Sequence, residues 1–214
     1  IVESSQDLLG EKVLARDEDP SFESCAALLS DVAGYTFLAT EHTTAKIAVA
    51  ADGSLGELPL RHGEMALNKV IFDPRDHLPR HESVAGKRGL LGGYLPAVDY
   101  GFFDKETGCG WEELVFVPQG AAHSAVEVLV ALRIESRGDT QRKYFRAGAA
   151  CKPISSHEFF AALLGLKHYW ETVFSPAMDV ELPEPRISDA CRASLARAFI
   201  TYDGVAPHYG LGNY

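Results

Sequence analysis

An alternating run of apolar residues near the middle of the chain sets the strongest constraint on its fold. Five apolar side chains recur at every second position: Val126, Val128, Val130, Leu132 and Ile134. Residues with that period lie on one face of a β-strand. The opposite face mixes Glu127 and Arg133 with Leu129 and Ala131, so it is only partly polar. The segment 125–139 therefore predicts a half-buried strand inside a large antiparallel sheet.

Further strand candidates surround this run. Short apolar or alternating stretches occur at 35–39, 45–58, 67–73 and 111–120, and a turn at 136–139 leads into 140–148. The dipeptide Asp52-Gly53 divides the second stretch and indicates a hairpin. Glycine and proline are frequent between Pro79 and Gly101, so we expect long loops there. Strands at this spacing predict a mainly β fold, with a large antiparallel β-sandwich over residues 1–152.

The hydrophobic period changes after residue 155. The residues recurring at helical spacing are Phe159, Leu163, Leu166 and Trp170. They predict a helix over 155–174 with one buried stripe, which makes Trp170 a core residue. Ser155 and Glu158 have the spacing of a capping box at its start. Three prolines within 175–186 then predict an extended strap, because proline restricts its own backbone and that of the preceding residue.

A second helix is expected to begin with Ser188 as its N-cap, to carry Asp189 near the positive end of its dipole, and to end at Gly204. Its predicted buried side comprises Ile187, Cys191, Leu195, Phe199 and Tyr202. This helix is apolar enough to need partners on a broad face.

Composition narrows the function classes. The 214 residues carry 20 basic and 30 acidic side chains, a formal net charge of −10, which disfavours nucleic-acid binding. No segment approaches the roughly 20 consecutive apolar residues that span a bilayer. The four cysteines (Cys25, Cys109, Cys151 and Cys191) contain no C-x-x-C pair, so zinc ribbons and thioredoxin-type sites are not expected. Two disulfides in any of three pairings remain open, and so does the compartment.

The order of these elements resembles a known family plan. The segments that carry the resemblance are GCGWEELVFVPQG at 108–120, VLVALRIESRGD at 128–139 and LPEPRISDACRASLARAFITYDGVAPHYGLGNY at 182–214. Together they look like the front part of six-hairpin glycosidase-type enzymes, over residues 25–214. The resemblance implies a β-supersandwich at 1–152, a linker helix and proline-rich strap at 153–186, and the first helix of a truncated (α/α)6 barrel at 187–214. It also implies an oligo- or polysaccharide substrate, and a remaining barrel supplied by the same polypeptide or by a partner subunit.

In enzymes of this plan the catalytic carboxylates belong to the barrel beyond its first helix, so the resemblance implies that they lie outside this chain. The residues agree with that expectation. Glu112 and Glu113 are adjacent and would point to opposite faces of a strand, whereas glycoside cleavage needs two carboxyl groups across one bond. Glu181 and Glu184 lie in the proline-rich strap and read as solvated. We expect no catalytic residue, cofactor or metal in the chain itself.

His208 and Tyr209 are the candidate substrate-binding residues. By the resemblance they lie at the barrel mouth, where an aromatic ring and an imidazole contact a sugar; packing of a loop with Gly210 and Gly212 is the alternative. Asp203 and Asn213 rank lower, because both are frequent in turns.

Three other groups of residues are candidate sites. Pro79 disfavours a helical metal site formed by His77, His81 and Glu82. The acids Asp99, Asp104 and Glu106 do not match a calcium-loop spacing and read as a solvated loop. Trp111 is either a core residue or an exposed sugar platform, and core is favoured.

Two other functions remain open. One is a non-catalytic carbohydrate-binding sandwich, and the other is a structural domain whose second helix docks on a partner.

Overall fold

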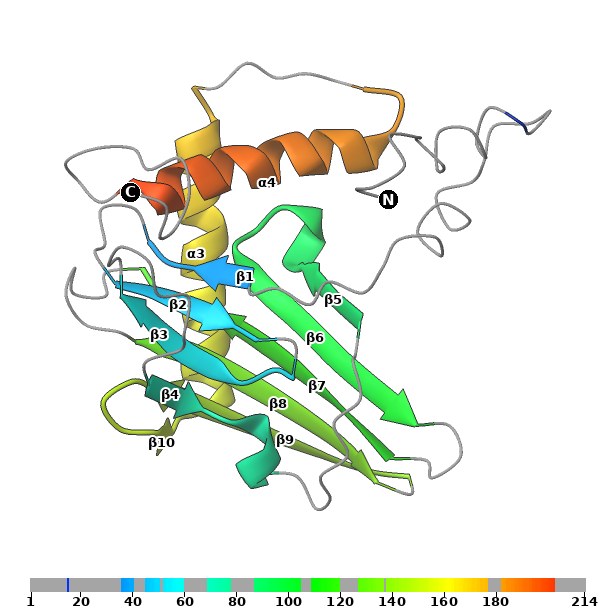
Figure 1. The fold of residues 1–214 in the computed structure, drawn as a ribbon, viewed down its shortest axis with the longest axis vertical. Helices are drawn as coiled ribbons and strands as arrows, with labels where there is room; N and C mark the ends of the chain where they lie inside the picture. The colour runs from blue at the N-terminus through cyan, green and yellow to red at the C-terminus, as the bar shows by residue number, and fades with distance from the viewer. Residues whose placement is uncertain are drawn as a thin grey trace, which may run out of the picture. The chain divides into compact units, whose positions relative to one another are not determined.

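The computed structural model describes Ala15 and residues 36–40, 45–50, 52–59, 69–77, 87–104, 109–119, 127–136, 138–176 and 182–202. The chain divides into two compact units, Ile1–Ala33 and Gly34–Tyr214. All the elements described below belong to the second unit. They make it mainly β, with two antiparallel sheets and two α-helices among the described residues (Figure 1).

The smaller sheet has four strands in sequential order. They are β1 (Thr36–Leu38), β2 (Ala45–Val49), β3 (Leu55–Pro59) and β4 (Lys69–Phe72), and every neighbouring pair is antiparallel. The predicted hairpin at Asp52-Gly53 is confirmed between β2 and β3. Its connection spans 50–54, and Gly53 supplies the positive φ of 82° that the turn requires. A short 3-10 helix, η1 (Pro74–His77), follows β4.

The larger sheet has six antiparallel strands in the order β10-β9-β8-β7-β6-β5. They are β5 (Lys87–Leu90), β6 (Ala97–Asp104), β7 (Cys109–Phe116), β8 (Val128–Ser136), β9 (Asp139–Ala147) and β10 (Lys152–Pro153), with the 3-10 helix η2 (Leu91–Gly93) after β5. The expectation of long loops between Pro79 and Gly101 is therefore wrong for 87–101. Two of the glycines that suggested loops lie within strands: Gly89 is in β5, and Gly101 in β6 leaves room for the Glu112 side chain.

The two sheets share one hydrophobic core. Its residues from the smaller sheet are Leu38, Ile47, Val49, Leu55 and Phe72, and those from the larger sheet include Val98, Val115, Val130, Leu132 and Ile134. The alternation that was predicted for β8 is confirmed at Val128, Val130, Leu132 and Ile134, which all face this core. Burial of these side chains is the main force that holds the sheets together.

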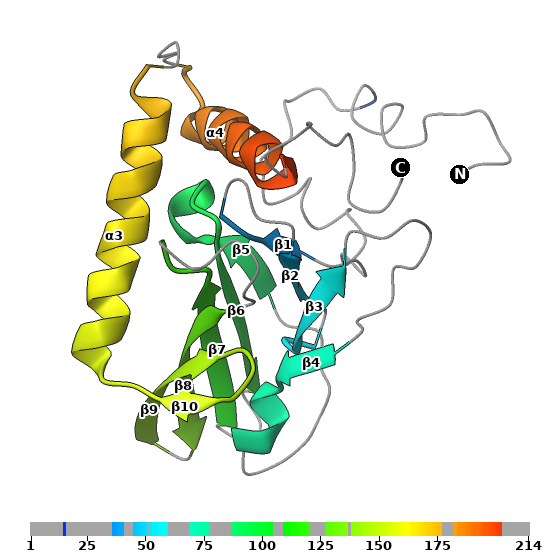
Figure 2. The same ribbon diagram turned by 90° about the vertical axis from the view of Figure 1, so that its left-hand side faces the viewer.

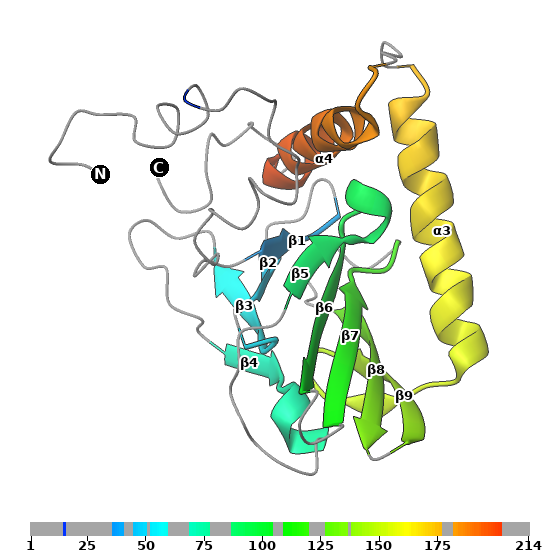
Figure 3. The same ribbon diagram turned by 90° about the vertical axis from the view of Figure 1, so that its right-hand side faces the viewer.

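Helix α3 (Ser156–Phe174) covers the other face of the larger sheet, opposite the smaller sheet (Figures 2 and 3). A second core forms there from Phe159, Leu166 and Trp170 of the helix and from Phe116 and Leu129 of the sheet. Trp170 is fully buried, as predicted. Ser155 is the N-cap of α3, and its hydroxyl accepts a hydrogen bond from the Glu158 backbone N–H. The Glu158 carboxylate pairs with Arg146 of β9.

Helix α4 (Pro185–Thr201) begins four residues earlier than predicted. Glu184 is its N-cap, and its side chain accepts a hydrogen bond from the Arg186 backbone N–H. The prediction that the strap continues to residue 186 is wrong, because proline at the first helical position favours the helical backbone instead of breaking it.

The predicted buried side of α4 is wrong at its first two positions. Ile187 and Cys191 are exposed, while Leu195, Phe199 and Tyr202 are partly buried. The buried residues are Ala196, Ile200 and Thr201. The beginning of the helix packs against η2 and Tyr94, where Asp189 lies against Gly93 and the Arg192 guanidinium lies 5.6 Å from the Tyr94 ring centroid. Because Gly93 has no Cβ atom, the helix can approach η2 this closely. This contact orients α4 so that its buried side does not include Ile187.

Candidate functional site

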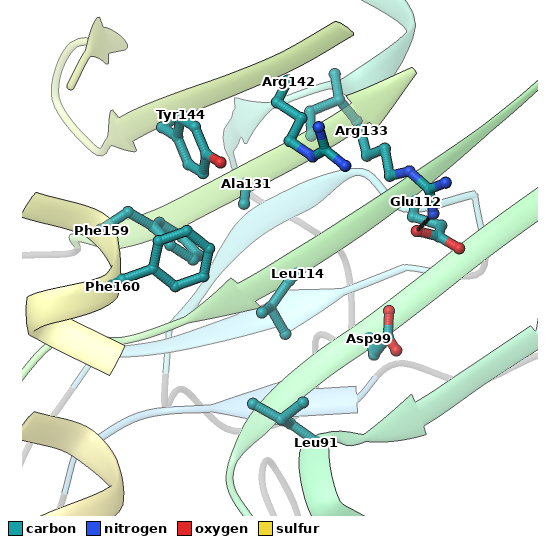
Figure 4. Close-up of a pocket in the computed structure, with 11 residues that line it drawn as sticks. Leu91, Asp99, Glu112, Leu114, Ala131, Arg133, Arg142, Tyr144, Phe159 and Phe160 are labelled. Carbon is teal, nitrogen blue, oxygen red and sulfur yellow. Dashed lines mark hydrogen bonds and ion pairs between the residues drawn. The ribbon is translucent and has the colours of Figure 1, made fainter. Parts of the chain in front are cut away.

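An open groove lies on the α3 side of the larger sheet, beside the first turns of the helix (Figure 4). Its volume is about 230 Å³. The side chains around it come from η2, β6, β7, β8, β9 and α3: Leu91, Asp99, Glu112, Leu114, Ala131, Leu132, Arg133, Arg142, Tyr144, Phe159 and Phe160. It combines apolar and aromatic side chains with several charged ones, so it is the candidate binding site.

Strand register arranges the floor of this groove in two rows. Leu114 lies opposite Ala131, which lies opposite Tyr144, and this row is apolar. Two residues further along each strand, Glu112 lies opposite Arg133, which lies opposite Arg142. Both rows are on the same face, because side chains two apart along a strand point the same way. An apolar row therefore runs beside a charged row across three strands.

Three aromatic rings close one end of the groove. Phe160 from α3 is 48% exposed, and its ring lies 5.9 Å from that of Tyr144, nearly perpendicular at 67°. Phe159 is buried behind them, with its centroid 5.4 Å from Tyr144. The two accessible rings meet at a steep angle and form an aromatic corner, defined here as Tyr144 and Phe160 (Figure 4). Such a corner presents two apolar walls to a ligand.

The charged row is unevenly neutralised. Arg133 forms ion pairs with Glu112, at 2.8 Å, and with Glu135. Arg142 is exposed and makes no hydrogen bond or ion pair within the part of the chain that the structure describes. At the β6 end of the groove, partial burial raises the pKa of the Asp99 carboxyl, with a smaller contribution from the nearby Glu112 charge. The Arg142 guanidinium, which has no ion-pair partner among the described residues, therefore lies next to the aromatic corner.

Glu113 faces the opposite way, into the core between the sheets. Its side chain is 1% exposed, and neither carboxyl oxygen has a hydrogen-bond partner among the described residues. Burial raises its pKa well above the ordinary value, and the charges of Asp73 and Asp52 raise it further. The prediction that Glu112 and Glu113 lie on opposite faces and cannot act together is confirmed.

The turn over Glu113 is tightly built. Arg75 pairs with Asp73 at 2.6 Å and with Asp52 at 3.4 Å, which ties η1 to the β2–β3 turn. A Cβ atom on Gly53 would lie 2.9 Å from Oε2 of Glu113. The β2–β3 turn therefore lies directly against the buried carboxyl.

Most of the residues that were predicted as sites fall outside the part of the chain that the structure describes. His208 and Tyr209, with Asp203 and Asn213, lie outside the described residues. His77 is part of the core edge, because its ring stacks on Phe72, with centroids 5.1 Å apart, and lies 4.4 Å from the Phe145 ring centroid. His81, Glu82, Glu106, Glu181 and Cys25 also fall outside the described part.

The remaining candidate residues that the structure describes do not form a metal or binding site at their predicted positions, with Asp99 as the exception that lines the groove. Within the described ranges, no three His, Cys, Asp or Glu side chains lie close enough to hold a metal ion. Trp111 is partly buried, with its ring 5.1 Å from that of Tyr100. Cys109, Cys151 and Cys191 are free thiols. Asp99 lines the groove instead of belonging to a loop, since it is a residue of β6.

No pattern in the sequence indicated the groove. Arg142 and Tyr144 alternate on one face of β9, and that period was visible in the sequence. Phe160 is a second aromatic residue beside Phe159, outside the predicted buried stripe of α3. Only the strand register and the position of α3 bring the three side chains together.

No family model, curated protein or solved structure matches the chain. Neither of the described helices has the length and apolar character that crossing a membrane requires.

Proposed function

We propose that this chain is the front part of a carbohydrate-active enzyme, of glycoside hydrolase or related phosphorolytic type. In this proposal the two sheets form a supersandwich that supports a helical catalytic domain, and α4 is the first helix of that domain. The observation that carries the proposal is the outward side of α4, which is apolar although it is exposed.

Helix α4 has apolar residues on more than one side. Ala196 and Ile200 are buried against the two-sheet body. On the other side Ile187 is 52% exposed, and Ala190, Cys191 and Ala198 are exposed with it. A helix that is apolar on both sides is typical of a position between two packed layers. A layer of further helices on this outward side agrees with the family plan that the element order resembles.

We assign the acid and the base of glycoside cleavage to that helical domain. In the two-sheet body, the Glu112 carboxylate is already paired with Arg133, and Glu113 lies in the opposite core. A retaining or inverting mechanism needs two carboxyl groups about 5 to 9.5 Å apart across the scissile bond. Glu112 and Glu113 face opposite sides of one strand and do not meet that requirement.

The test compares this 214-residue chain with the complete product of the gene that encodes it. Reducing-sugar release is measured from a panel of oligosaccharides, with and without inorganic phosphate. We expect cleavage by the complete product and none by the 214 residues alone. Cleavage by the 214 residues, or no cleavage by the complete product across the panel, would contradict the proposal.

A pair of variants tests the outward side of α4 in the same assay. In the complete product, Ile187→Glu is expected to lower both activity and thermal stability, because a charge would be buried between the layers. Ile187→Leu preserves the apolar contact and is expected to behave like the unchanged protein. Equal behaviour of the two variants would count against a helical layer at this position.

A second candidate function is a non-catalytic carbohydrate-binding module, favoured by the groove on the larger sheet. An aromatic corner beside planar polar side chains is a suitable surface for a sugar ring, whose C–H faces are apolar and whose rim carries hydroxyls. Calorimetric titration of the 214 residues with glycans tests it. Binding by these residues alone favours the module, whereas binding only by the complete product favours the enzyme.

A further inference from the structure

We propose that the groove on the larger sheet binds an acidic saccharide, whose ring lies against the aromatic corner of Tyr144 and Phe160 and whose carboxylate pairs with Arg142. The inference rests on the proposed carbohydrate function and specifies the chemical class of the ligand. A sugar of the hexuronate type has both features, because its carboxylate is attached directly to the pyranose ring.

Arg142 lies in a position that favours a bound anion. Its register partner across β8 and β9 is Arg133, so two guanidinium groups stand opposite each other. Like charges in that position destabilise a sheet unless they are compensated. Arg133 is compensated by Glu112 and Glu135, and Arg142 is compensated by no described residue. A bound anion would supply the missing charge.

The aromatic corner lies beside that charge. Phe160 is half exposed, although most phenylalanine side chains of this size are buried. Tyr144 lies two residues from Arg142 on the same face of β9, about 7 Å along the strand. That spacing allows one sugar ring to lie on the aromatic corner while its carboxylate reaches the Arg142 guanidinium. Guanidinium and carboxylate groups match in a planar, bidentate pair.

The acidic side chain at the far end of the groove is too distant to neutralise Arg142. Asp99 lies on β6, three strand spacings from β9, which is about 14 Å away. That distance exceeds the screening length of about 10 Å at 0.1 M salt, so Asp99 does not neutralise Arg142. Its carboxyl oxygens can accept a hydrogen bond from a hydroxyl of a further sugar unit. An oligosaccharide would then run across the strands from β9 towards β6, with its acidic unit at the β9 end (Figure 4).

The negative net charge of the protein argues against non-specific binding of an anionic glycan. With a formal net charge of −10, the protein repels anions in general, so an anionic glycan is not expected to bind by non-specific attraction. Binding of an acidic sugar therefore has to come from a local site.

The experiment titrates the 214-residue protein with two oligosaccharides of equal length, a trigalacturonate and the neutral galactotriose, by calorimetry at 0.1 M salt. We expect the trigalacturonate to bind about tenfold more tightly than the neutral sugar, the difference that one good charge pair supplies. Arg142→Gln should reduce the acidic sugar to the affinity of the neutral one. Phe160→Ala should weaken both sugars several-fold, because it removes a stacking wall.

Controls separate local effects from unfolding. Arg197→Gln removes an exposed arginine of α4 outside the groove and should leave both affinities unchanged. Phe160 is half exposed, so the thermal midpoint of Phe160→Ala should stay close to that of the unchanged protein. A large drop in that midpoint would show a structural role for Phe160 and overturn its assignment as a sugar wall.

Three results would overturn the inference. Equal affinity for the two sugars, with no effect of Arg142→Gln, would leave carbohydrate binding in place but refute the acidic class. Equally tight binding of a tri-glutamate peptide would refute the saccharide. No binding of either sugar would refute the groove as a site, whereas the proposed enzyme function is decided separately by the cleavage assay on the complete gene product.

Discussion

Replacing Glu113 with glutamine is expected to remove a pH dependence of stability that this one carboxyl imposes. The side chain is buried between the two sheets, and neither oxygen has a described hydrogen-bond partner. Burial, together with the charges of Asp73 and Asp52, raises its folded-state pKa well above the ordinary value. The folded protein therefore keeps the proton at pH values where the unfolded chain has lost it.

The sign and size follow from proton linkage. Glu113 is protonated in both states at low pH, so it does not oppose folding there. As the pH rises above the ordinary carboxyl pKa, the unfolded state binds fewer protons than the folded state, and stability falls until the folded-state pKa is passed. One proton changes the free energy of unfolding by about 1.4 kcal/mol per pH unit. Between pH 5 and pH 7 the loss from this residue is therefore at most about 2.7 kcal/mol.

The measurement is urea unfolding at pH 5, 6 and 7, followed by tryptophan fluorescence. We expect the difference in unfolding free energy between Glu113→Gln and the unchanged protein to shift in favour of the variant as the pH rises. Glu112→Gln is the matched control, since the neighbouring glutamate points to the exposed face and belongs to a surface ion pair of small energy. Parallel pH profiles for Glu113→Gln and the unchanged protein would refute the reasoning.

Three further predictions concern core packing, a turn glycine and a buried histidine. Leu166→Ala should destabilise the protein by about 2–5 kcal/mol, because Leu166 is 1% exposed in the α3 core. Leu164 is 67% exposed, so Leu164→Ala should change stability by about 0.5 kcal/mol or less. Urea unfolding of both variants measures the difference. Gly53→Ala should cost more than Gly138→Ala in thermal melts. Both glycines have positive φ (82° and 88°), but a Cβ on Gly53 would lie 2.8 Å from Trp111 Cη2, while nothing lies within 4 Å at Gly138. Burial, with help from Lys143, lowers the His77 pKa, so the unfolded state binds more protons and stability falls as the pH drops below about 6.5. His77→Phe retains a ring between Phe72 and Phe145 and should lose that acid sensitivity, which calorimetric melting at pH 5 and 7 will show; an unchanged difference between the two pH values would contradict it.

Local periodicity predicted the elements whose side chains are sorted by burial. The apolar positions of β8 follow a period of two and face one core, and Leu129 on the other face meets α3. Phe159, Leu166 and Trp170 follow a helical period and form the buried side of α3. In both cases the pattern within one segment is sufficient, because burial acts on each residue separately.

The elements that were missed depend on neighbours far away in the sequence. Gly101 reads as a loop residue until the Glu112 side chain on the adjacent strand is known to fill the space beside it. The rotation of α4 depends on Gly93, which admits the Asp189 side chain. A proline at position 185 reads equally well as the end of a strap or as the first residue of a helix, and only the Glu184 cap decides.

The groove could not be predicted from the sequence either, because it also depends on residues that are distant in the sequence. Arg142 lies opposite Arg133, and Arg133 opposite Glu112, because of the register of three strands. Neither a composition nor a spacing rule fixes that register. The family plan suggested by the element order remains a proposal, and the site it pointed to at His208 and Tyr209 lies outside the described residues.

Both sides of β8 have a task, since Leu132 faces the core between the sheets while Arg133 lines the groove. Deleting or inserting one residue inside this strand would exchange its two faces. Charged side chains would then face the core between the sheets, and aliphatic side chains would face the groove. Related sequences that keep the fold should therefore vary in length at the open turn around Gly138 and hold the spacing of β8 constant.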